Sequence, residues 1–165
     1  MRRTTTIAAG IAAATLGLSG LLALSADATP AVGPPVSTPA PPRENTLAGP
    51  LRARADGISL RVTDDAVVRD FTLTYRPGDD SGWHQHPGIV LATVQAGTVV
   101  RTLPCRRPQA FTVGQAFTEV GPHFVANRGS ADAVLSITQI APAGTTGAAF
   151  REDLPAPTCR HRPHH

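Results

Sequence analysis

Hydrophobic residues fall in short runs between residues 51 and 142, and glycine, proline or aspartate separates each run from the next. The runs are rich in Val, Ile, Leu, Thr and Phe, and they include ISLRV, AVVRDFTLTY, GIVLATVQ, TVVRTL and AVLSITQIA. Their length and spacing are typical of an all-β sandwich or barrel. No run shows the 3.6-residue period of an amphipathic helix, so helices are expected to be minor. The pattern predicts a single all-β domain.

The segment from residue 84 to residue 95 alternates clearly, and alternate positions share one face of a strand. The even positions read His, His, Gly, Val, Ala, Val, whereas the odd ones read Gln, Pro, Ile, Leu, Thr, Gln. We therefore expect the even face to line a barrel interior with a polar patch at one end. His84 and His86, roughly 6–7 Å apart along such a strand, would converge on one point there.

A third histidine, His123, follows a Gly-Pro turn at the start of another short run, with Asn127 four residues further on. Burying unpaired imidazoles is costly, and a metal ion needs at least three ligands. The sequence therefore predicts that His84, His86 and His123 bind one metal ion. Hydrogen-bonded core histidines are the alternative, and Asn127 is expected to tie down a turn or to orient a ligand histidine.

The N-terminus predicts export. Residues 1–28 combine a basic MRR start, an apolar stretch and a small-residue ADA end, as in a cleaved signal peptide. An uncleaved anchor is the alternative, because the apolar stretch is about long enough to span a bilayer. We expect cleavage after Ala28, no stable membrane insertion of the mature chain, and a secreted or extracytoplasmic location.

The ends of the mature chain differ in composition from its middle. Residues 29–50 contain seven prolines and no hydrophobic period, so they are interpreted as an extended, mostly disordered linker. Residues 143–165 are interpreted as a polar C-terminal tail. The two cysteines, Cys105 and Cys159, favour a disulfide in an exported chain, with two buried thiols as the alternative.

Composition limits the partners. The formal net charge of the 165 residues is only +3, and no basic stripe carries interleaved aromatics, so nucleic acid is not an expected partner. Neither a Ser-His-Asp arrangement nor a phosphate loop is evident. A small-molecule ligand or substrate remains as the expected partner, and a homodimer stays open.

The histidine segment resembles the first motif of the cupin family, through Gly78, DDSGW, His84, His86 and Gly97. His123 with Asn127 is similar to the end of the second cupin motif. The resemblance covers roughly residues 51–142 and is greatest to small, exported, single-domain bacterial cupins. It implies a jelly-roll β-barrel, and it implies that Cys105 and Cys159 form the disulfide of that type.

The chain departs from the cupin pattern at the metal-binding glutamate, whose position holds Val90. The second motif is also shortened between Gly114 and His123, and it lacks its proline. The site is thus reduced to three histidines. Glu119 precedes the turn into His123 and offers a carboxylate, but we interpret it as a solvent-facing acid at the barrel rim.

Three neutral imidazoles suit Zn, Cu, Ni or ferrous iron, and suit Mn less well without a carboxylate. Three functions follow from such a site. The chain is a metalloenzyme that acts on a small molecule, a non-catalytic module that binds metal or a small ligand, or a degenerate barrel with structural histidines. The fold does not choose among them, so catalysis stays undecided.

Overall fold

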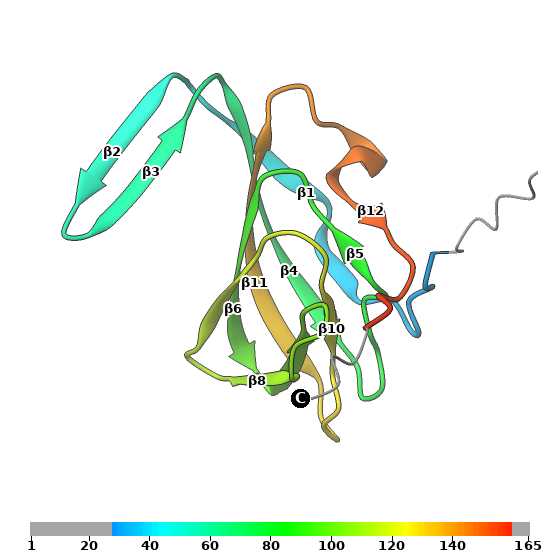
Figure 1. The fold of residues 1–165 in the computed structure, drawn as a ribbon. Helices are drawn as coiled ribbons and strands as arrows, with labels where there is room; N and C mark the ends of the chain where they lie inside the picture. Colours follow the sequence, from blue (N-terminus) through cyan, green and yellow to red (C-terminus); the bar gives the residue numbers. More distant parts are fainter. Residues whose placement is uncertain (1–27, 160–165) are drawn as a thin grey trace, which may run out of the picture.

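A computed structural model describes residues 28–159, and the expected signal peptide (1–28) lies outside this range except for Ala28. The largest sheet has five antiparallel strands in the order β1-β4-β11-β6-β9 (Figure 1). These strands are β1 (Val36–Leu47), β4 (Ala66–Tyr75), β11 (Ala133–Pro142), β6 (Ile89–Ala96) and β9 (Ala116–Glu119). We call it the main sheet.

A second, smaller layer closes the barrel opposite the main sheet. It consists of a three-stranded sheet in the order β10-β7-β8 and of the pair β12-β5 (Figure 1). The strands are β10 (Phe124–Ala126), β7 (Thr98–Thr102), β8 (Gln109–Thr112), β12 (Glu152–Asp153) and β5 (His84–Gln85). The described residues hold one short 3-10 helix, η1 (Gly147–Phe150), and no helix among them is long and apolar enough to cross a membrane. The prediction of an all-β jelly-roll barrel is confirmed.

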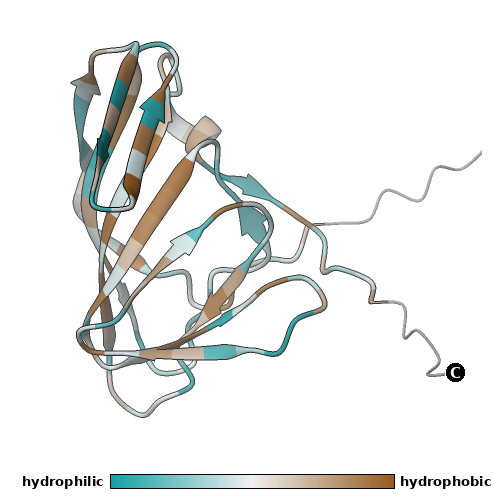
Figure 2. Cartoon of the chain, turned by 60° about the vertical axis from the view of Figure 1, so that its left-hand side comes forward, coloured by the Kyte–Doolittle hydropathy of each residue, from teal (hydrophilic) through white to brown (hydrophobic). Residues whose placement is uncertain are grey.

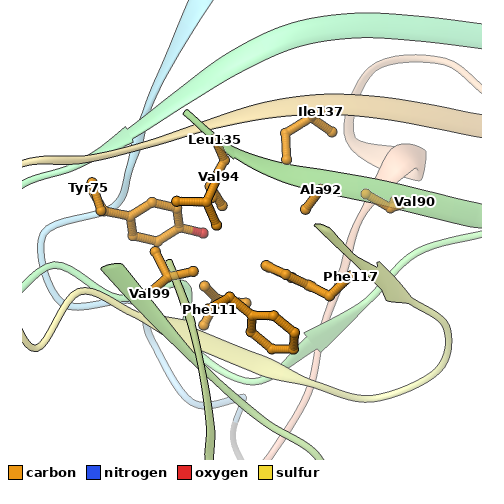
Figure 3. Close-up of a cluster of buried hydrophobic side chains, with 11 residues drawn as sticks. Tyr75, Val90, Ala92, Val94, Val99, Phe111, Phe117, Leu135 and Ile137 are labelled. Carbon is orange, nitrogen blue, oxygen red and sulfur yellow. The ribbon is translucent and has the colours of Figure 1, made fainter. Parts of the chain in front are cut away.

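Hydrophobic side chains from both layers pack together between the sheets, as Figure 3 shows. Even positions 90, 92 and 94 of β6 are buried, whereas Ile89 and Leu91 are about half exposed. The predicted alternation of this strand is therefore confirmed. The core consists of Tyr75, Val90, Ala92, Val94, Val99, Phe111, Phe117, Val125, Ala133, Leu135 and Ile137.

Gly88 explains how one continuous sequence pattern gives two separate strands. β5 ends at Gln85 and β6 begins at Ile89, and between them Gly88 adopts a φ of +80°, which disfavours other L-residues. A Cβ atom on Gly88 would lie 2.0 Å from the carbonyl oxygen of Ile140. The glycine thus lets the chain turn closely over β11, and both histidines still face the interior.

The prediction of a disordered linker over residues 29–50 is wrong for strand β1. β1 pairs with β4 over much of its length, from Val36↔Thr74 to Leu47↔Ala66. Prolines are tolerated because β1 is an edge strand, where they break no ladder on the outer side. Three of them fall between Thr38 and Arg43, where the register shifts.

β2 (Leu51–Ala55) and β3 (Ile58–Val62) form a hairpin that pairs with no other strand and projects from the barrel (Figure 1). Cross-strand partners match in polarity: Leu51 faces Val62 and Ala53 faces Leu60, whereas Arg52 faces Arg61. Figure 2 shows the resulting alternation of hydrophobic and hydrophilic residues along both strands. We call this hairpin the arm; the prediction placed it inside the barrel domain.

The segment after Pro142 is more than the polar tail that its composition indicates. β12 pairs with β5 through Glu152↔Gln85 and Asp153↔His84, so it lies beside the first histidine. The predicted disulfide joins Cys105 to Cys159, with the two Cα atoms 5.4 Å apart. The last histidines of the chain, in residues 160–165, lie outside the described residues.

Candidate metal centre

His84 of β5 pairs with His123, the residue that immediately precedes β10. The backbone N–H of His84 donates to the carbonyl of His123 at 3.0 Å, and the N–H of His123 donates back to His84 at 2.9 Å. This mutual pair places the two residues directly opposite each other, with ring centroids 4.2 Å apart. Both histidines are buried, His123 completely. The backbone therefore brings together two of the three histidines that the sequence selected.

A backbone carbonyl holds the Nδ1 atom of each histidine. His84 Nδ1 lies 3.0 Å from the oxygen of Gly82, His86 Nδ1 lies 2.8 Å from that of Phe150, and His123 Nδ1 lies 2.8 Å from that of Gly121. A carbonyl oxygen only accepts, so each Nδ1 must carry the proton. A neutral ring then presents its Nε2 lone pair away from that carbonyl. All three rings are thereby fixed in the tautomer that binds a metal through Nε2.

Glu119, at the end of β9, completes the group. Its Oε2 atom lies 3.5 Å from Nε2 of His86 and 3.5 Å from Nε2 of His123. The residue is only 6% exposed, so its interpretation as a solvent-facing rim acid is wrong. β9 continues with regular alternation to its last residue, and the Gly-Pro turn comes only afterwards. This alternation places Glu119 on the same interior face as Phe117.

The position of Glu119 relates directly to the missing glutamate at position 90. β6 and β9 pair with Val90 opposite Glu119, and directly opposed Cβ atoms in an antiparallel pair are about 4.5–5.5 Å apart. The carboxylate therefore enters the site from the neighbouring strand, beside the position where the cupin pattern has it. Sequence spacing alone gives no sign of this, because the register between the two strands is a property of the folded sheet.

The surroundings favour a neutral imidazole at His84 and a charged carboxylate at Glu119. Burial, reinforced by the nearby His123, lowers the pKa of His84 to about 3. Burial alone would raise the pKa of Glu119, but the adjacent imidazoles of His123 and His86 bring it well below its ordinary value. Three nitrogen lone pairs and one carboxylate thus face a common point, and these electron-rich atoms attract a cation to it.

The donor set fits a metal ion. Ligand atoms from His84, His86, Glu119 and His123 all lie within 4.8 Å of one another. Nε2 of His123 is fully buried and has no hydrogen-bond partner, which is costly for a polar atom. A metal ion would satisfy this nitrogen. Three imidazoles with one carboxylate form an open site that suits Zn, Cu, Ni or Fe, and the oxygen ligand makes Mn suitable as well.

A cavity of about 590 Å³ opens on this group. Its walls combine apolar side chains with two arginines, and they come mainly from β4, β11, the segment around η1 and residues 31–42. Ser81, His84, His86 and Glu119 also line it. A volume of this size is suited to a small organic molecule.

Asn127, which the sequence pattern singled out, has a structural role, and Trp83 packs beside the histidines' strand. Asn127 donates to the carbonyls of Tyr75 and Ala131 and accepts from the N–H of Gly129, so it ties down the turn after β10. Trp83 packs against Phe124 with ring centroids 5.9 Å apart. Sequence reasoning missed Phe150, whose carbonyl also accepts a hydrogen bond from Gln139, because no motif marks a residue that acts through its backbone.

Comparisons with known proteins give structural matches only. No protein-family model matches the chain, and no curated protein matches it. A double-stranded β-helix protein from Klebsiella pneumoniae matches at 18% identity and a TM-score of 0.44, over 52% of this chain and 73% of that one. A cupin-like protein from Thermotoga maritima matches at 16% identity and a TM-score of 0.44, over 57% and 79%.

An oxalate oxidase also matches, at 18% identity and a TM-score of 0.39, over 46% of this chain and 46% of that chain. The chain thus spans about half the length of that enzyme. These likenesses concern the fold, and they say nothing of the chemistry at the histidine group.

Proposed function

We propose that this chain, which has the double-stranded β-helix fold of the cupins, binds one divalent metal ion through His84, His86 and His123, with Glu119 as a fourth ligand. The observation that carries the proposal is the fixed tautomer of each ring. Three separate backbone carbonyls accept hydrogen bonds from the Nδ1–H groups, so the three Nε2 lone pairs point toward one place. Core histidines with a purely structural role need no such common direction.

The bound metal would supply Lewis acidity to a small molecule in the adjoining cavity. The chain's own residues would position that ion, exclude bulk water from His84 and His123 by burial, and keep Glu119 charged. Binding a small molecule at the metal is therefore the proposed activity. A non-catalytic metal- or ligand-binding module uses the same site, and a substrate screen on metal-loaded protein separates it from an enzyme.

The test is a titration of untagged, metal-free protein with Zn, Cu, Ni, Fe and Mn salts. The wild type is expected to bind one ion per chain. Each of His84→Ala, His86→Ala and His123→Ala should weaken binding strongly, because it leaves a smaller donor set. A variant with His161, His164 and His165 all changed to alanine is the control and should bind as the wild type does. Wild-type affinity in His123→Ala would refute the proposal.

We also propose that the mature protein works outside the cytoplasm. The signal-like N-terminus and the Cys105–Cys159 disulfide support this, because disulfides persist in oxidising compartments. N-terminal sequencing of the secreted protein should begin at Thr29. Recovery of the intact Met1 terminus in a membrane fraction would indicate an anchor.

A further inference from the structure

One row of directly paired residues crosses the main sheet and ends at the proposed metal ligands. We call these four residues, His84, His86, Glu119 and His123, the metal group. Glu44 of β1 faces Arg69 of β4, Arg69 faces Gln139 of β11, Gln139 faces Val90 of β6, and Val90 faces Glu119 of β9. Adjacent strands are about 4.8 Å apart, so three spacings, on the order of 14 Å, separate the backbones of Arg69 and Glu119. Their side chains line one cavity. A cation therefore lies across the cavity from the proposed metal ligands.

The guanidinium of Arg69 is poorly satisfied by the protein itself. Its side chain is 13% exposed, and Nε is buried with no hydrogen bond. Glu44 approaches this Nε at 3.6 Å, and the Glu44 side chain is 47% exposed. Within residues 28–159 the five N–H donors of Arg69 have no hydrogen-bond acceptor. An arginine fork without acceptors is suited to a carboxylate, which it can bind in a bidentate manner.

Phe150 connects the guanidinium to the metal group. The Cζ atom of Arg69 lies 3.8 Å from the centroid of the Phe150 ring, while the Phe150 carbonyl lies 2.8 Å from Nδ1 of His86. The ring covers one face of the guanidinium and leaves its edges for a ligand. The residue that fixes His86 thus also fixes the direction of Arg69.

The second arginine of the cavity, Arg151, is occupied. It donates to the carboxylate of Asp153 at 2.7 Å and to the carbonyl of Ser81. The contrast identifies Arg69 as the cation with free donors. Next to the polar row, the same wall is apolar, with Phe71, Leu73 and Ile137 lining the cavity.

We propose that the cavity binds a small organic carboxylate, whose carboxylate group pairs with Arg69, whose apolar body lies against Phe71 and Ile137, and whose other end reaches the metal group. This inference rests on the proposed function for the metal end of the ligand. The arginine end stands on the Arg69 contacts alone. The class of ligand follows from the chemistry of the wall: one planar cation, one apolar surface and one metal-binding group.

The experiment measures binding of matched pairs of probes, acetate with acetamide, benzoate with benzamide, and phenylacetate with phenylacetamide. Ligand-observed NMR and calorimetry on metal-loaded protein give the affinities. At least one carboxylate should bind about tenfold or more tightly than its amide, because charge-assisted hydrogen bonds are strong. Arg69→Gln should remove that preference. Arg61→Gln, which makes the same charge change on the exposed arm, should keep it.

Two further variants keep the test decisive if Arg69→Gln folds poorly. Glu44→Gln removes the carboxylate that competes for Arg69 and should tighten carboxylate binding several-fold. Arg69→Lys keeps the charge but loses the planar fork, so binding should weaken only in part. The proposal is overturned if no carboxylate is preferred over its amide, or if Arg69→Gln and Glu44→Gln leave the preference unchanged.

The same titrations with chelator-treated protein separate this inference from the metal proposal. A preference for carboxylates that needs Arg69 but persists in a chain that binds no metal would support the arginine site and refute the metal function. If the chain binds metal but shows no preference for carboxylates, the metal function is supported and the arginine site is refuted.

Discussion

The replacement of Glu119 by glutamine tests whether this carboxylate on β9, which lies opposite Val90 of β6, is a metal ligand. Glutamine keeps the size of the side chain and removes one negative charge next to two histidine Nε2 atoms, each 3.5 Å away. If Glu119 is a ligand, the proposed metal ion loses its only anionic donor. If it is merely a buried partner of the histidines, metal affinity should change little.

The magnitude can be estimated from charge and burial. Two unit charges 4 Å apart attract by about 4 kcal/mol at an effective dielectric constant of 20, and a divalent ion doubles this gross figure. The amide oxygen retains part of the interaction, and hydrogen bonds to charged groups are worth about 1.5–3 kcal/mol net. We therefore expect Glu119→Gln to cost about 2–3 kcal/mol, which is about 30- to 150-fold in Kd.

The assay is competition for metal against a chromophoric chelator at fixed pH. Glu152→Gln, an exposed glutamate on β12, makes the same chemical change outside the cavity and should have no effect. Glu119→Val should bind metal weakly. Adding Val90→Glu to that variant returns a carboxylate to the directly paired position and should recover most of the affinity. Affinity within threefold of the wild type in Glu119→Gln would refute the assignment of Glu119 as a ligand.

Three further predictions concern stability. Metal-free protein should lose stability as pH falls below about 6.5, because His84 becomes protonated in the unfolded chain while its pKa in the folded chain is about 3. This residue lowers the free energy of unfolding by at most about 1.4 kcal/mol per pH unit. Urea titrations should show that the free energy of unfolding depends less steeply on pH in His84→Asn. Reduction of the Cys105–Cys159 disulfide, which links residues 54 positions apart, should cost about 4 kcal/mol, measured by chemical denaturation with and without reductant. Replacement of arm residues 51–62 by a short Gly-Ser linker should leave metal stoichiometry unchanged and lower the Tm only slightly, since the arm pairs with no other strand; calorimetry checks it.

The barrel was predictable because its strands alternate in polarity. Val90 and Val94 are buried where the period places them, and Ile89 and Leu91 are exposed. The edge strand β1 was not predictable from its own residues, because proline-rich sequences favour extended, unpaired chain. Pairing with β4 overrides that preference, because β4 would otherwise present an unpaired edge. The proline-rich segment can form hydrogen bonds along this edge without a steric clash. Tertiary context therefore decides the structure of residues 36–47.

The three histidines could be predicted from their spacing in the sequence, but the other residues of the cavity could not. Spacing places His84 and His86 on one face, and the turn before His123 starts a new strand, so sequence alone proposes the trio. Glu119, Arg69 and Phe150 reach the cavity through strand pairing and through a segment that follows the last barrel strand. Interactions of that kind depend on register, which no local pattern of this sequence specifies.

Strand pairing also shows why the proposed carboxylate ligand could occupy either of two positions, whereas the histidines are constrained. Val90 and Glu119 are directly opposed, so a carboxylate on either residue starts from nearly the same place and faces the same interior. The histidines have no such freedom. His84 and His123 exchange both backbone hydrogen bonds, and the carbonyls of Gly82 and Gly121 hold their rings from two residues away. Moving either histidine by one position would turn its side chain to the opposite face and separate Nδ1 from its acceptor. The barrel thus fixes His84 and His123 through the backbone, whereas the proposed carboxylate ligand could come from either of two paired positions.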